Sequence, residues 1–211
     1  MPRSLTLAAT TAIILSLHLA ASQLHAAEQR VEGTLADLLL TDVAGTVHRP
    51  MEEKGVQAVA LVFITPDCPI ANFYQPTLRK LGDEFVTRGV PLYLVHSDPD
   101  VTAEDAERHI AKFKIELPVV LDHDQSIARR VGATVTPEAF IVDLNGKTLY
   151  QGRIDNFYEA LGRKRRAATE HDFHDALAAV ADGKGVATPQ TKALGCKIPY
   201  ATDSQRLPVS K

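Results

Sequence analysis

Apolar and polar residues alternate along the chain with two different periods. The runs QAVALVFI at residues 57–64 and VPLYLVH at 90–96 are apolar on both faces and rich in branched side chains, which predicts buried strands. Between them, apolar residues recur every three or four positions over residues 70–88, which predicts an amphipathic helix. Pro76 lies inside this helix and predicts a kink, because proline cannot donate to the preceding turn. The order strand, helix, strand indicates an α/β domain.

The same pattern continues with shorter elements. Thr102 followed by Asp105 resembles a capping box and predicts the start of a second helix. Asn145-Gly146 is a turn signal that predicts a hairpin, and hence an antiparallel pair after the parallel part. The other predicted elements are strands at 118–121, 139–143 and 148–152, helices at 124–131 and 169–181, and two short leading strands at 34–40 and 46–48.

The first residues are typical of a secretory signal peptide. Arg3 precedes an apolar run at residues 5–21, and small residues follow around Ala26 and Ala27. Thr, Ser and His interrupt the run, which falls short of the roughly 18 to 20 strongly apolar residues of a spanning helix. We therefore expect residues 1–26 to be cleaved and the protein to be exported, periplasmic in a bacterium, with no membrane association after cleavage. An uncleaved anchor is the alternative.

Length and charge set the organisation of the rest. Cleavage leaves 185 of 211 residues, enough for one domain at 27–185 and an extended tail at 186–211. Loss of Arg3 reduces 23 basic residues to 22 against 26 acidic ones, a net charge near −4. This balance argues against nucleic-acid binding. We interpret the basic cluster at 163–166 as a solvated loop or helix face; a binding patch is the alternative.

Cys68 is the candidate reactive residue, in the stretch TPDCPIAN that joins the first buried strand to the long helix. It falls at the N-cap, since Pro69 suits the first helical position. Free backbone N–H groups and the helix dipole favour a thiolate there, whereas the neighbouring Asp67 carboxylate opposes it. We predict a pKa of Cys68 below that of a free thiol. The alternative is an inert buried thiol.

Together these features resemble the thioredoxin-like superfamily, and within it the bacterial exported redoxins with an AhpC/TSA-type, peroxiredoxin-like domain. The motifs that carry the resemblance are DCPIAN at 67–72, GRID at 152–155 and Gly195-Cys196. The resemblance covers roughly residues 33–200. It implies a thioredoxin-like α/β fold with a central mixed sheet flanked by helices, an N-terminal extension and an extended C-terminal tail.

The resemblance also implies site residues, with two departures. Thr136-Pro137 corresponds to the Thr-Pro whose proline is cis and faces the active cysteine, and Thr65 corresponds to the threonine that orients a peroxide in peroxiredoxins. Ala71 replaces the second cysteine of a CxxC pair, which excludes a dithiol oxidoreductase of the usual kind. The peroxiredoxin arginine is absent, because Glu138 follows Thr136-Pro137. Arg129, Arg130 and Arg153 remain candidates to replace it.

Cys196, the second of two cysteines, has several possible roles. It is a resolving thiol that attacks an oxidised Cys68, a static bridge to Cys68, or an intermolecular link; its separation from Cys68 in sequence does not decide among them. We expect no cofactor and no metal site. His171 and His174, spaced i, i+3 on the last predicted helix, lack an evident third ligand.

The leading hypothesis is therefore an exported thiol-based oxidoreductase of the antioxidant type. Cys68 is the nucleophile toward a peroxide or a protein disulfide, Cys196 resolves the product, and an external thiol restores the reduced form. Thr65, Asp67, Pro69, Thr136 and Pro137 shape the pocket. The competing hypothesis is a non-enzymatic interaction module of the periplasm, which the loss of the CxxC cysteine and of the arginine favours.

Overall fold

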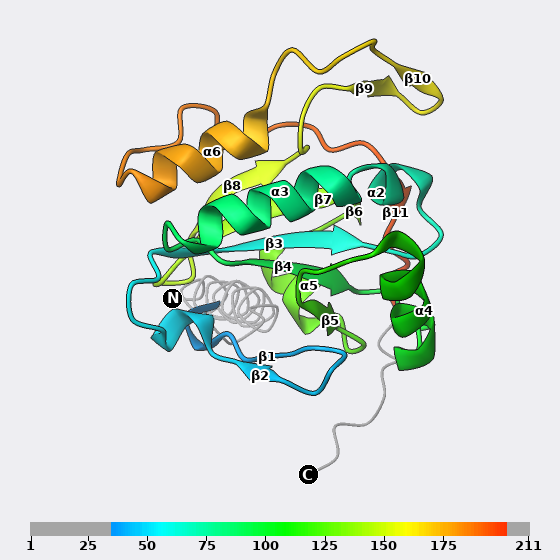
Figure 1. Cartoon of the computed structure of the whole chain (residues 1–211), viewed down its shortest axis with the longest axis horizontal. Coiled ribbons are helices and arrows are strands. Elements are labelled where there is room, and N and C mark those ends of the chain that lie inside the picture. The colour runs from blue at the N-terminus through cyan, green and yellow to red at the C-terminus, as the bar shows by residue number, and fades with distance from the viewer. Residues whose placement is uncertain (1–34, 202–211) are drawn as a thin grey trace, which may run out of the picture. The chain divides into compact units, whose positions relative to one another are not determined.

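A five-stranded mixed sheet forms the centre of the computed structural model, which describes residues 35–201 (Figure 1). The strand order is β5-β4-β3-β7-β8. Three strands are parallel, and the last two are antiparallel to their neighbours, as the predicted hairpin required. The strands are β3 (Ala58–Ile64), β4 (Leu92–His96), β5 (Val119–Leu121), β7 (Glu138–Asp143) and β8 (Thr148–Gly152).

Helices cover the two faces of this sheet because β3 is apolar on both sides. Ala60 and Val62 pack in one cluster with residues of α3 (Gln75–Val86) and α6 (Asp172–Ala181). Leu61 and Phe63 point the other way, into a second cluster with α5 (Ser126–Val131) and the N-terminal segment. The helix α4 (Ala103–Phe113) begins at Thr102, whose capping box with Asp105 is present as predicted.

The long helix predicted over 70–88 is two helices, α2 (Pro69–Phe73) and α3. The break falls at Tyr74, and Pro76 lies in the first turn of α3, where its missing N–H costs no intrahelical bond. Proline therefore starts a new helix instead of kinking one. Tyr74 is buried in the core as expected, but Phe73 is 43% exposed, and its interpretation as a core residue was wrong.

Short paired segments surround the main sheet. They are β1 (Leu40–Thr41) with β2 (Val47–His48), β6 (Val135–Thr136) with β11 (Cys196–Lys197), and β9 (Tyr158–Ala160) with β10 (Arg163–Lys164). The strand predicted at 34–40 was wrong for most of its length, since Leu35–Asp37 is a 3-10 helix. Leu35 and Leu38 are both buried at a spacing of three, which fits a helical turn and not a strand.

The expected signal peptide lies outside the described residues. Among residues 35–201, no helix is long and apolar enough to cross a membrane. The tail, expected to be extended chain, includes β11 and a bridge between Gln190 and Gln151 of β8. The C-terminal segment therefore packs on the sheet as far as the description extends.

Candidate active site: two cysteines at a cis-proline

Cys68 is the N-cap of α2, as the sequence predicted, but its side chain is fully buried. Its backbone N–H donates to the Thr65 carbonyl oxygen at 3.2 Å, which closes the turn after β3. Its Sγ donates to the Thr136 carbonyl oxygen at 2.9 Å. The backbone of Cys68 lies at the turn between β3 and α2, as expected, but its sulfur is not open to solvent. The C-terminal segment with Cys196 lies against it.

The peptide bond between Thr136 and Pro137 is cis, as the resemblance implied. Thr136 ends β6, and β11 pairs with it antiparallel in a register that places Cys196 opposite Thr136. Gly195 makes this approach possible: a Cβ there would lie 1.9 Å from the Thr136 carbonyl oxygen. The pairing brings Cys196 to Cys68 across 128 residues of sequence.

The two thiols shift one another's pKa in opposite directions. Burial raises the pKa of Cys68, but hydrogen bonds from the Cys196 thiol, the Ala71 backbone and Thr136 outweigh it and hold this pKa below its ordinary value. Burial, the hydrogen bond to Cys68 and the negative charge of Cys68 raise the pKa of Cys196 to about 11. Cys68 therefore loses its proton at a lower pH than Cys196 does, and it is the thiol of the pair that ionises first.

The Thr136 hydroxyl is positioned to donate a hydrogen bond to Cys68 once Cys68 is ionised. Its Oγ1 is buried and has no partner within residues 35–201 while Cys68 is a thiol. Because a buried hydroxyl without a partner is unfavourable, deprotonation of Cys68 provides the missing acceptor. Thr136 is accordingly among the groups that lower the pKa of Cys68.

The other predicted site residues have less direct roles. Thr65 holds the turn through its carbonyl group, and Pro69 opens α2. Asp67 is exposed, and its negative charge acts to raise the pKa of His109. It is not among the groups that shift the pKa of Cys68.

None of the three candidate arginines bonds to Cys68 in the described chain. Arg129 donates to the Ala201 carbonyl at 2.7 Å and stacks over Tyr200, and Arg130 is exposed. Arg153 pairs with Glu170 and Asp172. None of these three side chains therefore takes the place of the peroxiredoxin arginine in the structure of residues 35–201.

The GRID motif docks the C-terminal segment beside the cysteines. A Cβ at Gly152 would lie 2.1 Å from the Thr191 hydroxyl, so only glycine admits this segment against β8. Asp155 accepts hydrogen bonds from the Tyr74 hydroxyl and from the Phe157 backbone at 2.8 Å. The motif thus links β8, the helix break and the segment that leads to Cys196.

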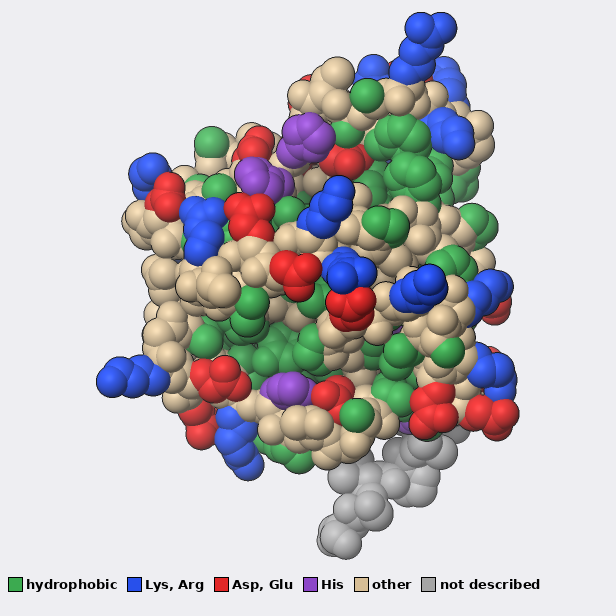
Figure 2. Space-filling model, in the orientation of Figure 1, with side chains coloured by type: hydrophobic (Ala, Val, Ile, Leu, Met, Phe, Trp, Pro, Cys, Tyr) green, Lys and Arg blue, Asp and Glu red, His purple; other side chains and the backbone are tan. Residues whose placement is uncertain are grey.

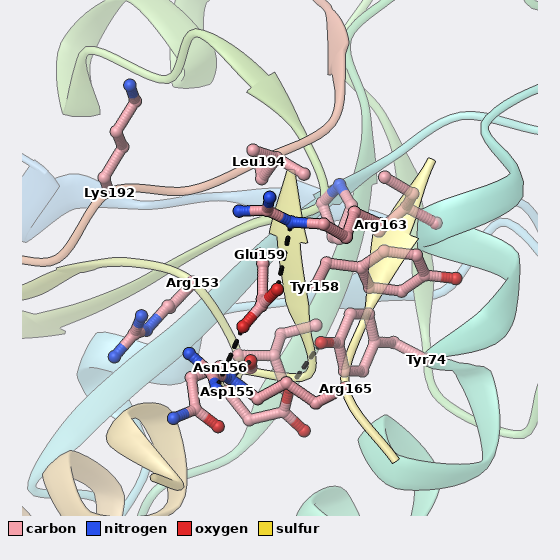
Figure 3. A pocket seen from close by; sticks show the side chains of 13 residues that line it. Tyr74, Arg153, Asp155, Asn156, Tyr158, Glu159, Arg163, Arg165, Lys192 and Leu194 are labelled. Atoms are coloured by element: carbon pink, nitrogen blue, oxygen red, sulfur yellow. Dashed lines mark hydrogen bonds and ion pairs between the residues drawn. The ribbon is translucent and has the colours of Figure 1, made fainter. Parts of the chain in front are cut away.

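A cavity of about 360 Å³ opens beside the cis-proline (Figure 3). Its lining includes Pro137, Ile70, Lys192 and residues of the β9–β10 hairpin. Tyr158 also lines the cavity. Burial is the largest cause that raises the pKa of Tyr158, and the negative charge of Cys68 is the second. Neither cysteine lines the cavity, but Pro137 follows Thr136 directly and Leu194, which also lines it, precedes Cys196 by two residues.

A chain of buried side chains behind the cysteine turn had no signal in the sequence. His96 Nδ1 lies 3.1 Å from the Ile64 carbonyl, His109 Nδ1 lies 3.4 Å from His96 Nε2, and His109 Nε2 lies 2.7 Å from Asn72 Oδ1. The Asn72 amide donates to the Pro66 carbonyl at 2.7 Å. Both ends of the histidine pair face acceptors, so two neutral rings satisfy the outer contacts and leave the 3.4 Å contact without a proton.

This histidine pair predicts acid sensitivity of the fold. Burial is the main cause that lowers the pKa of His96 to about 3 and that of His109 to about 4. The unfolded chain binds these protons from about pH 6.5 downward, and the native state does not, so stability falls as pH drops from about 6.5 to 4. At pH 5 each of these two histidines lowers the free energy of unfolding by about 2 kcal/mol.

The measurement is urea unfolding at pH 7 and pH 5. Between pH 7 and pH 5, the free energy of unfolding of His109→Gln should fall by about 2 kcal/mol less than that of the wild type. His171→Gln is the matched control, because His171 is exposed and its surroundings change little on unfolding. Equal pH dependence in wild type and His109→Gln would show that His109 is not the sensitive group.

Metal ligation has no geometric support in residues 35–201, where no group of three or more His, Cys, Asp or Glu side chains is placed to hold an ion. His174 instead contacts Asp175 at 3.2 Å and Glu84 at 3.7 Å.

These features define a class: a redoxin with the thioredoxin-like fold, in which a cysteine at a helix N-terminus faces a cis-proline. The chain belongs to the AhpC/TSA family, whose sequence profile matches residues 31–151, more than half of the chain. The matched range includes Cys68, Thr136 and Pro137 but ends before Cys196. Family membership is consistent with a thiol-based oxidoreductase.

Individual relatives agree with this assignment. The thiol-disulfide oxidoreductase ResA of Geobacillus thermodenitrificans (strain NG80-2) is 26% identical over 118 residues, which span 56% of this chain and 66%, just under two thirds, of the relative. A hypothetical protein from Sinorhizobium meliloti 1021 is 27% identical, with a TM-score of 0.68 over 80% of this chain and 93% of that one. An uncharacterized conserved protein from Geobacillus kaustophilus is 25% identical, with a TM-score of 0.69 over 81% and 92%.

Proposed function

We propose that this protein is a thiol-disulfide oxidoreductase whose redox couple is Cys68 and Cys196. The observation that carries the proposal is that both cysteines meet Thr136 at the cis-proline: Cys68 Sγ donates to its carbonyl oxygen at 2.9 Å, and Cys196 pairs opposite it in β11. The opposite pKa shifts of the two thiols agree with this arrangement. A thiolate with a protonated neighbour is the arrangement that disulfide exchange requires. The name of the ResA relative, a thiol-disulfide oxidoreductase, supports the same reaction class.

The proposed reaction has two exchange steps. The Cys68 thiolate attacks one sulfur of a partner protein's disulfide; a Cys68–partner disulfide forms, and the other partner sulfur leaves as a thiolate that takes up a proton. Cys196, after losing its proton, attacks the Cys68 sulfur and releases the second partner thiol. The partner is reduced to two thiols, and Cys68 and Cys196 become a disulfide. A dithiol of another protein then reduces this disulfide.

Access to Cys68 requires a movement of β11. The sulfur is buried, and β11 pairs with β6 over only two residues. The chain is anchored on both sides of this short ladder, by Thr191 on β8 before it and by Ile198, Tyr200 and Ala201 after it. The movement is therefore a local one at Cys196, where the ladder is much shorter than the strands of the main sheet. We propose that a partner reaches Cys68 when β11 moves aside, and that Cys196 resolves the mixed disulfide on its return.

A hydroperoxide is the second substrate class to test. Its attack by the Cys68 thiolate would give a sulfenic acid and an alcohol, and condensation with Cys196 would give the same disulfide and water. Thr65 is the peroxiredoxin feature present, but no arginine of the described residues 35–201 bonds to Cys68, which favours the protein disulfide. The lowered pKa of Cys68 speaks against a pure interaction module, because a binding surface does not need a thiol that ionises easily.

Export and domain organisation complete the proposal. A signal peptide at 1–26, a redoxin domain at 27–185 and a tail at 186–211 would place the protein in an oxidising compartment, where disulfide partners occur.

The test is intact mass and free-thiol count on reduced protein, before and after stoichiometric oxidised glutathione or hydrogen peroxide. A mass lower by two hydrogens, with both thiols lost and no adduct, is the expected result with glutathione. A stable glutathione adduct on Cys68 would show that Cys196 does not resolve the mixed disulfide. Two unreacted thiols with both oxidants would overturn the proposal in favour of the interaction module.

A further inference from the structure

The hairpin of β9 and β10 stands beyond the edge of the main sheet, on the side of α6 and the C-terminal segment (Figure 1). It carries the basic cluster 163–166, which was interpreted as a solvated loop or helix face. The structure places this cluster on β10 and the residues that follow it. Arg163 and Arg165 line the cavity that also contacts Pro137. The cluster therefore lies at the rim of the active site.

The cluster leaves positive charge uncompensated. Arg163 and Arg165 both pair with Glu159, each at 3.0 Å (Figure 3). Lys164 and Arg166 are exposed and form no ion pair with any residue between 35 and 201, and the same holds for Lys192 on the opposite rim. Because the whole chain has a formal charge of −3, this rim is positive against an acidic background. Figure 2 shows Lys and Arg side chains gathered at this end.

Exposed apolar side chains lie at both ends of the hairpin. Phe73, which is 43% exposed, stacks on Phe157 at 4.7 Å with an angle of 11° between the rings, and meets Tyr158 edge-on at 5.4 Å. Leu161 at the hairpin turn is 69% exposed. These contacts join the hairpin to α2, the helix that begins next to Cys68. Phe73 and Leu161 are therefore exposed apolar side chains at the two ends of the hairpin, next to its basic residues.

We infer that the β9–β10 hairpin is a docking surface for an acidic segment of the partner protein, next to the partner cysteine that reacts with Cys68. The inference rests on the proposed function and specifies its substrate class. Lys164, Arg166 and Lys192 attract the acidic side chains, and Phe73 and Leu161 contact apolar residues beside them. The partner cysteine then lies over the cavity at Pro137. Charges at the rim of an interface act mainly on the association rate.

The test compares two synthetic peptides that carry one cysteine as a mixed disulfide with thionitrobenzoate. One has a run of glutamates beside the cysteine and the other a run of glutamines. Reduced protein is mixed with each, and the release of thionitrobenzoate gives the second-order rate constant. We expect the acidic peptide to react at least about tenfold faster at low ionic strength, with the difference shrinking as salt is added.

Charge reversal locates the surface. The double variant Lys164→Glu/Arg166→Glu should abolish the preference for the acidic peptide and leave the rate with the glutamine peptide nearly unchanged. The matched control is Lys54→Glu/Lys147→Glu, which makes the same change in net charge at exposed positions near the opposite end of the sheet, where Ala58 pairs with Asp143. It should retain most of the preference.

The outcomes separate the two proposals. If neither peptide reacts with wild-type protein, the proposed function fails. If both react at equal rates, or if the control variant loses the preference as fully as the hairpin variant, the proposed function stands and the docking surface is wrong. A preference that persists in 1 M salt, where the Debye length is about 3 Å, would also contradict it.

Discussion

Replacing Cys68 by Ser is expected to lower disulfide exchange by at least about a thousandfold, with the fold intact. The thiolate is the nucleophile, and a serine hydroxyl is not ionised at neutral pH. Ser is close in size to Cys, and its hydroxyl can donate to the same Thr136 carbonyl oxygen. The measurement is the rate of thionitrobenzoate release, together with circular dichroism to check the fold.

Cys196→Ser is the matched variant for this prediction. It should still react once with a mixed disulfide and then accumulate the Cys68–partner disulfide, which intact mass detects, because nothing resolves it. Turnover by Cys68→Ser at more than about a tenth of the wild-type rate would sink the assignment of Cys68 as nucleophile.

Gly195→Ala should separate the two cysteines. Its Cβ would meet the Thr136 carbonyl oxygen at 1.9 Å, a backbone atom that cannot move aside, so β11 must shift. We expect intramolecular disulfide formation to slow at least about tenfold, because the local concentration of Cys196 falls. Alkylation of Cys68 by iodoacetamide should accelerate, because its sulfur becomes uncovered. The two rates are measured on the same reduced protein.

Gly185→Ala is the control for this variant. A Cβ at Gly185 meets nothing within 4 Å, so the added methyl group finds open space in the same C-terminal region. Both rates should match those of the wild type. If Gly195→Ala also leaves both rates unchanged, β11 does not control the distance between the cysteines.

Local features of the site were predictable from the sequence because they depend on neighbours along the chain. The N-cap position of Cys68 follows from the strand before it and Pro69 after it, and the cis bond of Pro137 follows from family resemblance. The alternation of apolar runs likewise predicted the main-sheet strands and most of the helices, with errors of a few residues at their ends.

Long-range features were not predictable. The pairing of Cys196 with Thr136 depends on two residues of antiparallel ladder, too short to leave a periodic pattern. The contact of His96 with His109 joins a strand to a helix, and nothing in either element marks those residues as partners. The stacking of Phe73 on Phe157 joins α2 to the residue before β9, far along the chain. Such contacts arise from tertiary packing and leave no local signal.

The late position of Cys196 has a consequence for biosynthesis. The main sheet ends at Gly152 and α6 ends at Ala181, so both elements precede β11 in the order in which a ribosome makes the chain. A domain made from its N-terminus can form its core before Cys196 emerges. Until then Cys68 has neither its cover nor its resolving partner. The burial of Cys68 therefore marks a chain whose synthesis has passed residue 196, and a shorter nascent chain presents an uncovered Cys68 without the neighbour that lowers its pKa.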